Sequence, residues 1–452
     1  MLHVALPSNS HPERSWITEV VLWQFLGLEY ELTFDDANTA RISAAGRTLT
    51  LSDAFFATGM NLTSTVQRWN VDTSMPNVRL CVPNIPVLFG EPGFTIDQKG
   101  HALLSLDVFG SAFFMLTRYE ESKSHERDRH DRFPAEASLA VRFNFLDRPI
   151  VDEYAEILWE AMRRLWPTLE RKKHRGRKLI SCDVDLPFDP ACTSIFRLGR
   201  RLLGRASRER SLGALVTSTR NYWAVHRGDQ TRDPYWQGLT WIMDVNEKAG
   251  NQVTFNFIPE PTDSNMDNAP SLEDQRMRNL LQIVHARGHL VGIHPGYNTY
   301  RHPKAFASSV MTLRQAMTQE GIRQEELGGR QHYLRWDVNT TARLWSTNEL
   351  SYDSTLSYPT AAGFRTGTCR EYTMYDIKER RALLLKQRPL IVMENAVIDE
   401  CNMGLGHSDQ ALATMQYYKQ ICGRFDGDFT LLWHNSSFTG KADQAIYCDL
   451  IQ

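Results

Sequence analysis

Residues 179–185 read Leu-Ile-Ser-Cys-Asp-Val-Asp, a short apolar run that ends in two carboxylates. The run predicts a buried strand over residues 179–182, followed directly by Asp183 and Asp185. Both aspartates would then lie at the carboxyl end of the strand, the edge where working residues gather in parallel α/β folds. An Asp-x-Asp pair after a strand is also a common turn or helix cap, so the pair alone leaves both interpretations open.

Two more predicted strands end in imidazoles. Residues 290–293 lead into His294, and residues 429–433 lead into His434. A single histidine in such a place is more often structural, but two acids and two imidazoles on one rim favour a metal site or an acid–base site. Oxygen and nitrogen ligands without thiolates suit zinc or a neighbouring divalent metal.

The stretches between these strands alternate in the same way. Strand-like runs occur at residues 253–258 and 390–393, and helical patterns occur at residues 235–249, 271–287 and 304–320. Strand–helix alternation over about 270 residues predicts a parallel α/β sheet or barrel.

The N-terminal part mixes strand-like and helical stretches instead. Its predicted elements are a helix over residues 17–28, a strand over 47–52, a helix over 107–121 with Asp107 as its cap, and a helix over 151–165.

A basic, polar stretch, ERKKHRGRK at residues 170–178, separates the two parts. Because 452 residues exceed what one hydrophobic core usually organises, we place a domain boundary there. The expected arrangement is a smaller α/β domain over residues 1–170 and a second domain, which carries the parallel sheet or barrel, over residues 178–452.

Composition excludes some classes of function. The chain has 51 basic and 53 acidic side chains and a net charge of −2, which argues against a nucleic-acid partner. The basic stretch at residues 197–210 is interpreted as a solvated helix face.

No apolar run approaches the ~20 residues of a membrane span. The seven scattered cysteines suggest a reducing compartment, and the first residues do not resemble a signal peptide, so we expect a cytoplasmic protein.

At its strand ends the sequence resembles the polysaccharide deacetylase (NodB-homology) family, over residues 179–452. Asp183-Val-Asp185 is similar to the first motif, where the first aspartate is the catalytic base and the second binds the metal. The segment at residues 288–295, containing His294, is similar to the second motif, whose histidine is a metal ligand. Leu-Leu-Trp-His434 resembles the fifth, whose histidine is the general acid. The resemblance implies a distorted (β/α) barrel and a metal-dependent deacetylase acting on an amino sugar.

Other segments extend the resemblance. Arg330-Gln-His-Tyr333 occupies the place of the third motif, so Arg330 or Arg335 would orient the base aspartate, and a backbone N–H near Tyr333 would stabilise the oxyanion. The segment ending in Arg365 occupies the place of the fourth motif. The residues expected to contact substrate are Tyr297, Tyr333, Arg365 and Trp433.

The metal-ligand set departs from the family pattern. The family's second motif supplies another histidine four residues after the first, and this chain has Asn298 there. The third ligand is therefore His332 from the neighbouring strand end, or Asn298 through its amide oxygen. His302 is a further candidate, although it lies eight residues beyond His294. We favour His332, and Zn²⁺ or another divalent ion as the metal.

Longer segments resemble those of a subgroup linked to bacterial surface polysaccharides such as lipopolysaccharide O-antigen. They cover residues 113–121, 330–335 and 363–368, and the subgroup carries a similar N-terminal domain. The expected substrate is an intracellular sugar precursor, such as a nucleotide- or lipid-linked glycan. Two alternatives remain. One is a deacylase or deformylase of a non-sugar amide, and the other is a metal-free barrel that binds carbohydrate or assists assembly.

Overall fold

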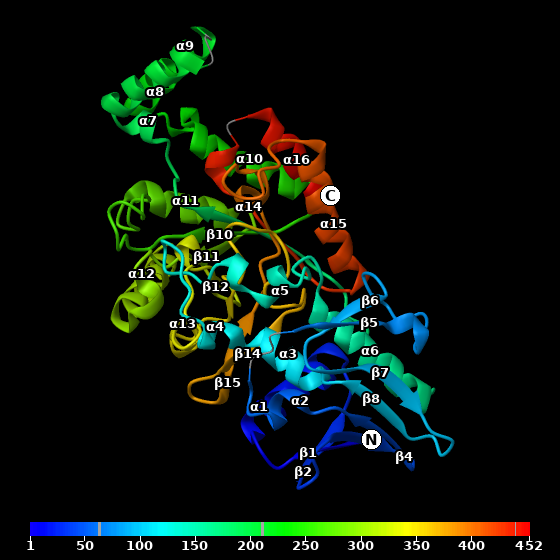
Figure 1. Cartoon of the computed structure of the whole chain (residues 1–452). Coiled ribbons are helices and arrows are strands. Elements are labelled where there is room, and N and C mark those ends of the chain that lie inside the picture. Colours follow the sequence, from blue (N-terminus) through cyan, green and yellow to red (C-terminus); the bar gives the residue numbers. More distant parts are fainter. Residues whose placement is uncertain (62–64, 209–211, 439) are drawn as a thin grey trace. The chain divides into compact units, whose positions relative to one another are not determined.

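The computed structural model describes residues 1–61, 65–208, 212–438 and 440–452, with the backbone alone for residues 204–208, 212 and 214. It is a mixed α/β protein with several sheets (Figure 1). The chain divides into two compact units, each assembled from three stretches. The first unit comprises Met1–Arg177, Leu334–Val392 and Tyr417–Phe429, and the second comprises Lys178–Tyr333, Met393–Gln416 and Thr430–Gln452.

The first unit contains a six-stranded sheet in the order β2-β1-β3-β4-β8-β7, an antiparallel β5–β6 pair, and the strands β13 to β15. Its strands are β1 (Leu2–Pro7), β2 (Tyr30–Asp35), β3 (Ala40–Ala44), β4 (Arg47–Leu51), β5 (Gln67–Asn70), β6 (Asn84–Val87), β7 (Gly90–Ile96), β8 (Ala102–Leu106), β13 (Tyr352–Asp353), β14 (Tyr372–Asp376) and β15 (Arg381–Gln387). Its helices are α1 (His11–Thr18), continued by a π-helical stretch (Glu19–Phe25), α2 (Ala54–Ala57), α3 (Val108–Leu116), α4 (Tyr119–Lys123), α5 (Leu139–Arg142), α6 (Ile150–Leu165) and α13 (Thr341–Thr347).

The predicted helix over residues 107–121 is two helices. Asp107 caps α3 as expected, since its carboxylate accepts the Gly110 N–H at 2.8 Å. The helix ends because Arg118 takes a left-handed conformation, with φ 56°. Its buried guanidinium donates to Glu121 at 2.8 Å, and that ion pair secures the break between α3 and α4.

The second unit contains neighbouring strands in the order β12-β11-β10-β9-β17, and β9 to β12 pair in parallel, as the strand–helix alternation predicted. Among the described residues these strands do not close into the expected barrel. These strands are β9 (Lys178–Val184), β10 (Val253–Phe257), β11 (Leu290–Ile293), β12 (Gly328–Gly329) and β17 (Phe429–Leu432), and the predicted strand at residues 390–393 is reduced to β16 (Val392–Met393). The first residue of β16 and that of β17 belong to the first unit. The helices are α7 (Pro190–Thr193), α8 (Ile195–Arg208), α9 (Leu212–His226), α10 (Pro234–Lys248), α11 (Gln275–Ala286), α12 (Pro303–Gln319), α14 (Glu394–Ile398), α15 (Asp409–Arg424, whose last residues belong to the first unit) and α16 (Lys441–Ile451).

Local sequence explains where these helices begin. Asp233 precedes Pro234 at the start of α10 and accepts the Tyr235 N–H at 2.9 Å. Asp274 caps α11 in the same way, through the Arg276 N–H at 2.8 Å. Such caps satisfy N–H groups that have no partner within the helix. They fix where each helix begins between consecutive parallel strands.

Between β9 and α10 the chain forms a helical insertion, α7 to α9. The basic stretch predicted at residues 197–210 runs along α8, and its last two residues lie outside the described part of the chain. Of the helices that the structure describes, none is both long enough and apolar enough to cross a membrane.

Candidate metal centre

Three predicted site residues meet where parallel strands end. Asp185 follows β9, His294 follows β11, and His332 lies shortly after β12. One ligand atom from each of the three lies within 4.8 Å of the other two. The Nε2 atom of His294 is 3.1 Å from Asp185 Oδ1, and that of His332 is 3.6 Å from the same oxygen. Parallel strands thus deliver one carboxylate and two imidazoles to one point.

Hydrogen bonds on the far side of each ring set the imidazole orientation. His294 Nδ1 donates to the Arg330 carbonyl at 2.6 Å, and His332 Nδ1 donates to Asp267 at 2.7 Å. Metal-binding histidines carry such partners, because a proton on Nδ1 leaves the lone pair of Nε2 for the metal. Asp185 Oδ1 is buried and, among the described residues, has no hydrogen-bond partner. The three donor atoms fit a divalent cation.

Charge at the centre supports the same conclusion. Burial would raise the pKa of Asp185, but His332 and His294 hold it well below its usual range. Burial would lower the pKa of His332, yet Asp185 and Asp267 raise it to about 9. A bound metal would replace the proton on His332 as the positive charge facing these carboxylates.

Asp183 lies beside the triad in a different setting. Its Oδ1 accepts hydrogen bonds from Arg330 Nη1 at 2.8 Å and from Asn256 Nδ2 at 2.7 Å. Its Oδ2 faces His294 Nε2 at 3.8 Å. Burial raises the pKa of Asp183, but Arg330, followed by His294 and His434, lowers it below the ordinary value. The carboxylate is therefore ionised, and one of its oxygens remains available.

The backbone places Asn256 against Asp183. The two residues are partners in the parallel register of β9 and β10, and Gly292 of β11 is the partner of Asn256 on the other side. A Cβ atom at Gly292 would lie 2.0 Å from Asn256 Oδ1. Glycine at this position therefore gives the amide room to reach Asp183.

His434 approaches the triad from β17. Its Nδ1 is 2.6 Å from Glu394 Oε1, and its Nε2 is 3.6 Å from Asp185 Oδ2. Burial lowers the pKa of His434, but Glu394, Asp185 and Asp183 together raise it to about 10. At neutral pH the ring is an imidazolium whose outer N–H can donate a proton.

The predicted substrate-contacting residues occupy varied places. Tyr297 and Tyr333 pack edge to face with ring centroids 5.3 Å apart, and Tyr333 also contacts the ring of His332 at 4.7 Å. Trp433 is fully buried and stacks on Phe438. In this conformation Trp433 offers no open ring face to a sugar, so we assign it to the core.

Two predicted arginines belong to the first unit. Arg335 donates to the His130 carbonyl at 2.8 Å, and Arg365 forms a buried ion pair with Glu121 at 2.8 Å. The arginine that holds Asp183 in the second unit is Arg330.

The two alternative third ligands, Asn298 and His302, have other surroundings. The side-chain amide of Asn298 donates to the Thr262 carbonyl at 3.1 Å. His302 is exposed immediately before α12. Among the described histidines and carboxylates, the structure groups His332, and not His302, with Asp185 and His294.

Sequence reasoning missed three partners of the site. Asn256 is a polar residue between two phenylalanines of a buried strand, a position that requires a hydrogen-bond partner. Glu394 directly follows the strand predicted at residues 390–393, so the rule that selected the other strand-end residues could have found it. Asp267 lies in the loop between β10 and α11, where no periodic pattern marks it.

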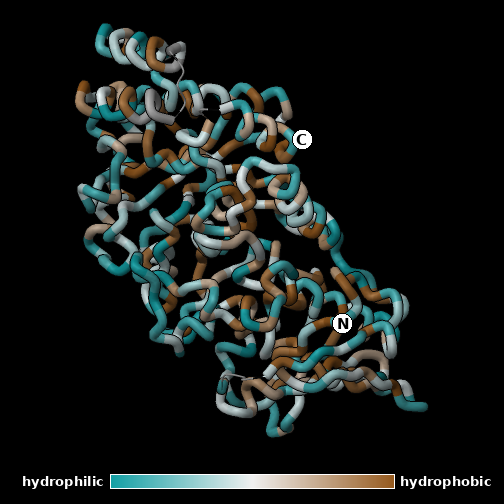
Figure 2. The backbone as a smooth tube through the Cα atoms, turned by 45° about the horizontal axis from the view of Figure 1, so that its top comes forward, coloured by the Kyte–Doolittle hydropathy of each residue, from teal (hydrophilic) through white to brown (hydrophobic). Residues whose placement is uncertain are grey.

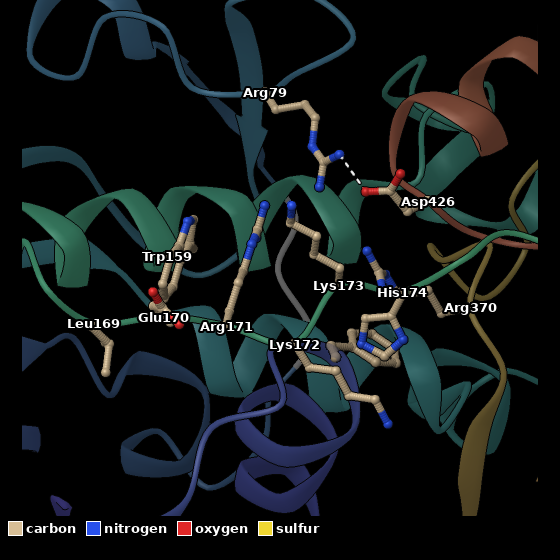
Figure 3. Close-up of a pocket in the computed structure, with 11 residues that line it drawn as sticks. Arg79, Trp159, Leu169, Glu170, Arg171, Lys172, Lys173, His174, Arg370 and Asp426 are labelled. Carbon is tan, nitrogen blue, oxygen red and sulfur yellow. Dashed lines mark hydrogen bonds and ion pairs between the residues drawn. The ribbon is translucent and has the colours of Figure 1, made fainter.

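A separate cavity of about 580 Å³ lies in the first unit (Figure 3). Its walls carry several cations, but most are already paired. Arg79 and Arg171 share Glu156 at 2.7 and 2.9 Å, Arg79 also contacts Asp426, and Arg370 contacts Asp152 at 3.0 Å. Of these pairs, Arg171–Glu156 ties the basic stretch expected between domains to α6 of the first unit.

Comparisons with known proteins give limited matches. Residues 2–167 match a sequence family described as a family of unknown function, DUF7033. No curated protein matches the chain. Similar solved structures include one described as a polysaccharide deacetylase from Mycobacterium smegmatis, with 12% identity over 62% of this chain and 85% of that one, and a TM-score of 0.39.

Two further solved structures are similar over less of the chain. The allantoinase Puue shares 13% identity over 47% of this chain and 65% of its own, with a TM-score of 0.33. The Xyl-CE4 domain of a multidomain xylanase from the hindgut metagenome of Trinervitermes trinervoides shares 12% identity over 47% and 74%, with a TM-score of 0.25. Because all three TM-scores are below 0.5, the function proposed below rests on the site and on the sequence.

Proposed function

We propose that the second unit is a metal-dependent amide hydrolase that deacylates an amino sugar. The observation that carries this proposal is the meeting of Asp185, His294 and His332 within 4.8 Å, flanked by an ionised Asp183 and a protonated His434. Base, metal ligands and acid lie around one point, as hydrolysis of a carbonyl compound requires.

The ligand set defines what a metal would contribute. A divalent ion such as zinc, held by Asp185, His294 and His332, would polarise the amide carbonyl and lower the pKa of a water molecule. All other functions in the reaction fall to groups of the protein itself.

Asp183 is the proposed general base. Arg330 and Asn256 both bind its Oδ1, which fixes the carboxylate and leaves Oδ2 to accept a proton from the attacking water. The water oxygen bonds to the amide carbon, and a backbone N–H near Tyr333 would stabilise the resulting oxyanion. Arg330 acts by holding the base and does not contact the reacting atoms.

His434 is the proposed general acid. Glu394 binds its Nδ1, so the proton on Nε2 is the one that can be donated. As the carbon–nitrogen bond breaks, that proton passes to the leaving amine, and the products are a carboxylic acid and an amino sugar. Asp183 thus takes a proton from the attacking water, and His434 gives a different proton to the leaving nitrogen.

The substrate class comes from the sequence. The segments that resemble polysaccharide deacetylases contain Asp183, His294 and His434, and the longer segments resemble those of the surface-polysaccharide subgroup. We therefore propose an N-acetylated sugar on a nucleotide- or lipid-linked precursor, acted on in the cytoplasm. Tyr297 and Tyr333, close to His332, are the proposed contacts to the sugar.

Metal analysis combined with an acetate-release assay tests this function. Purified protein should contain about one equivalent of divalent metal and release acetate from N-acetylated amino sugars. Chelation should abolish release, and added Zn²⁺ should restore it. Protein that takes up no metal after reconstitution would point to the carbohydrate-binding alternative. Formate or another acid released in place of acetate, from a non-sugar amide, would support the deacylase alternative.

A further inference from the structure

The hairpin formed by α8 and α9 has an unusual composition. Residues 190–228 contain eight arginines and a single acidic residue, Glu209, in a chain whose net charge is −2. The hairpin also carries some of the most exposed large apolar side chains in the described part of the chain. Figure 2 shows hydrophobic and hydrophilic residues interleaved along these helices.

On α8 the exposed residues form one stripe. Phe196 is 87% exposed and Leu203 is 76% exposed, with the exposed Arg200 between them. The spacings of four and three residues place all three side chains on one face of the helix. The stripe therefore alternates an apolar, a basic and an apolar side chain.

On α9 the same order is repeated. Val216 is 67% exposed and Trp223 is 52% exposed, and the exposed Arg220 lies between them. The spacings are again four and three residues, and the exposed Arg227 follows after four more. Two helices thus present the same arrangement of apolar and basic side chains.

These stripes are not the faces by which the two helices pack against the rest of the protein. Leu198 of α8 and Tyr222 and Val225 of α9 are buried, so each helix already uses other residues for packing. The apolar residues of the stripes remain exposed after that packing. Large exposed apolar side chains of this kind indicate an interaction surface.

We propose that the α8–α9 hairpin docks the protein on an anionic phospholipid surface. Phe196, Leu203, Val216 and Trp223 would enter the boundary between headgroups and acyl chains. The intervening arginines would contact lipid phosphates while their methylene stems cover apolar surface. Arginine-rich amphipathic helices bind such surfaces because apolar burial and attraction to anionic lipid add together.

Charge favours a lipid surface over a second copy of the hairpin. Pairing two such stripes would bring arginine against arginine, and the described residues of α8 and α9 offer no carboxylate to neutralise them. An anionic bilayer supplies the missing negative charge over the whole stripe. The proposal is independent of the amide hydrolysis above, although a lipid-linked substrate would lie at the same surface.

Vesicle co-sedimentation of the full chain tests the proposal. Phosphatidylcholine vesicles containing about a quarter phosphatidylglycerol should bind the protein, and pure phosphatidylcholine vesicles should bind it much more weakly. Binding should fall as salt is raised, because the arginine contribution is electrostatic. The paired variant Phe196→Ser/Leu203→Ser should weaken binding at least about tenfold, since two buried apolar side chains are lost.

Matched variants keep the test specific. Leu384→Ser removes a side chain that is 95% exposed on β15, and it should leave vesicle binding unchanged. Arg200→Glu/Arg220→Glu should abolish the preference for anionic lipid, whereas Arg381→Glu, which reverses an exposed charge on β15, should not. Circular dichroism and acetate release from a soluble substrate report folding and the separate hydrolase function.

Three results would overturn the proposal. The first is anionic-vesicle binding that the hairpin variants leave unchanged. The second is no vesicle binding together with a concentration-dependent dimer that Phe196→Ser/Leu203→Ser dissolves, which would make the hairpin a self-association surface. The third is salt-sensitive binding to RNA in the absence of any binding to vesicles.

Discussion

The two aspartates of the first motif have different partners, and this difference predicts different mutant phenotypes. Asp183 is held by Arg330 and Asn256, whereas Asp185 faces the two imidazoles. Asp183→Asn should keep the metal and the fold while lowering turnover by ~10²–10⁴, the usual contribution of a general base. Asp185→Asn should weaken metal affinity. Metal content and acetate release of the two isosteric variants distinguish these outcomes, and metal loss from Asp183→Asn alone would reverse the roles.

Glu394 sets the acidity of the proposed acid, which predicts a change in the pH profile. The pKa of His434 is raised to about 10 largely through Glu394, so His434 stays protonated until the pH rises through that value. Glu394→Gln removes the charge, and His434 should lose its proton at lower pH. The alkaline limb of kcat/KM should move down by about one pH unit or more.

The exposed Glu400 near the same helix provides the control. Glu400→Gln should leave the alkaline limb in place. An unchanged profile in Glu394→Gln would show that His434 is not the group that donates the proton.

At the residue scale, the sequence predicted the functional side chains that directly follow the strands. It did not predict the residues that hydrogen-bond to those side chains. Asp183, His294 and His434 follow apolar runs, so local pattern is sufficient to select them. Asp267 acts through a contact with His332, which is 65 residues away, and no local pattern encodes that contact. The departure at Asn298 raised the question of the third ligand, and only tertiary structure groups His332 with the other two.

At the scale of elements, β10 and β11 approach each other closely at Gly292. This close approach predicts the effect of adding one methyl group there. Gly292→Ala would place Cβ 2.0 Å from Asn256 Oδ1, so the amide must move away from Asp183. We expect a loss of about 1–3 kcal/mol in the free energy of unfolding, the usual cost of overpacking. Turnover should also fall, because Asp183 loses one of its two fixed hydrogen bonds.

Thermal unfolding and acetate release measure these two effects. Gly423→Ala on α15 is the matched control, since a Cβ there meets nothing within 4 Å. Alanine in a helix should leave stability unchanged or raise it by up to ~1 kcal/mol. Equal stability of Gly292→Ala and the parent protein would show that the strand spacing relaxes at no cost.

How well a strand or helix can be predicted from the sequence depends on how strong its hydrophobic pattern is. The strands β9, β10 and β11 are buried along most of their length, and their apolar runs marked them within one or two residues. In the first unit, β2 alternates half-buried and exposed residues without a fully buried position, so its pattern is weak. The helix expected over residues 17–28 begins earlier, at His11, and continues as a π-helical stretch that a 3.6-residue period does not describe.

At the scale of the whole molecule, residues far apart in sequence build the first unit. Trp16 Nε1 donates to the Thr373 carbonyl at 3.0 Å, and Tyr372 donates its hydroxyl proton to the Leu116 carbonyl at 2.7 Å. Tyr372 and Tyr375 belong to the same buried apolar cluster as the N-terminal residues. Local pattern placed a boundary near residue 170, but it could not show that residues 334–392 pack with residues 1–177.

This interdependence predicts the behaviour of a truncated chain. A fragment of residues 178–452 retains Asp183, Asp185, His294, His332 and His434, the residues proposed for chemistry. It loses the partners of Tyr372 and Tyr375, which are 0% and 6% exposed in the full chain. Exposing two buried aromatic rings costs several kcal/mol, a large share of ordinary domain stability. The fragment should therefore aggregate or unfold at a lower temperature than the full chain.

Co-expression distinguishes loss of folding from loss of the site. If residues 1–177 supply only packing, adding them as a separate chain should restore solubility, metal content and acetate release of the fragment together. A fragment that is as stable as the full chain would show that residues 334–392 fold without the N-terminal part. A restored, metal-loaded fragment that stays inactive would instead show that covalent continuity through residue 177 is needed for turnover, because every residue proposed for the chemistry would then be present and folded.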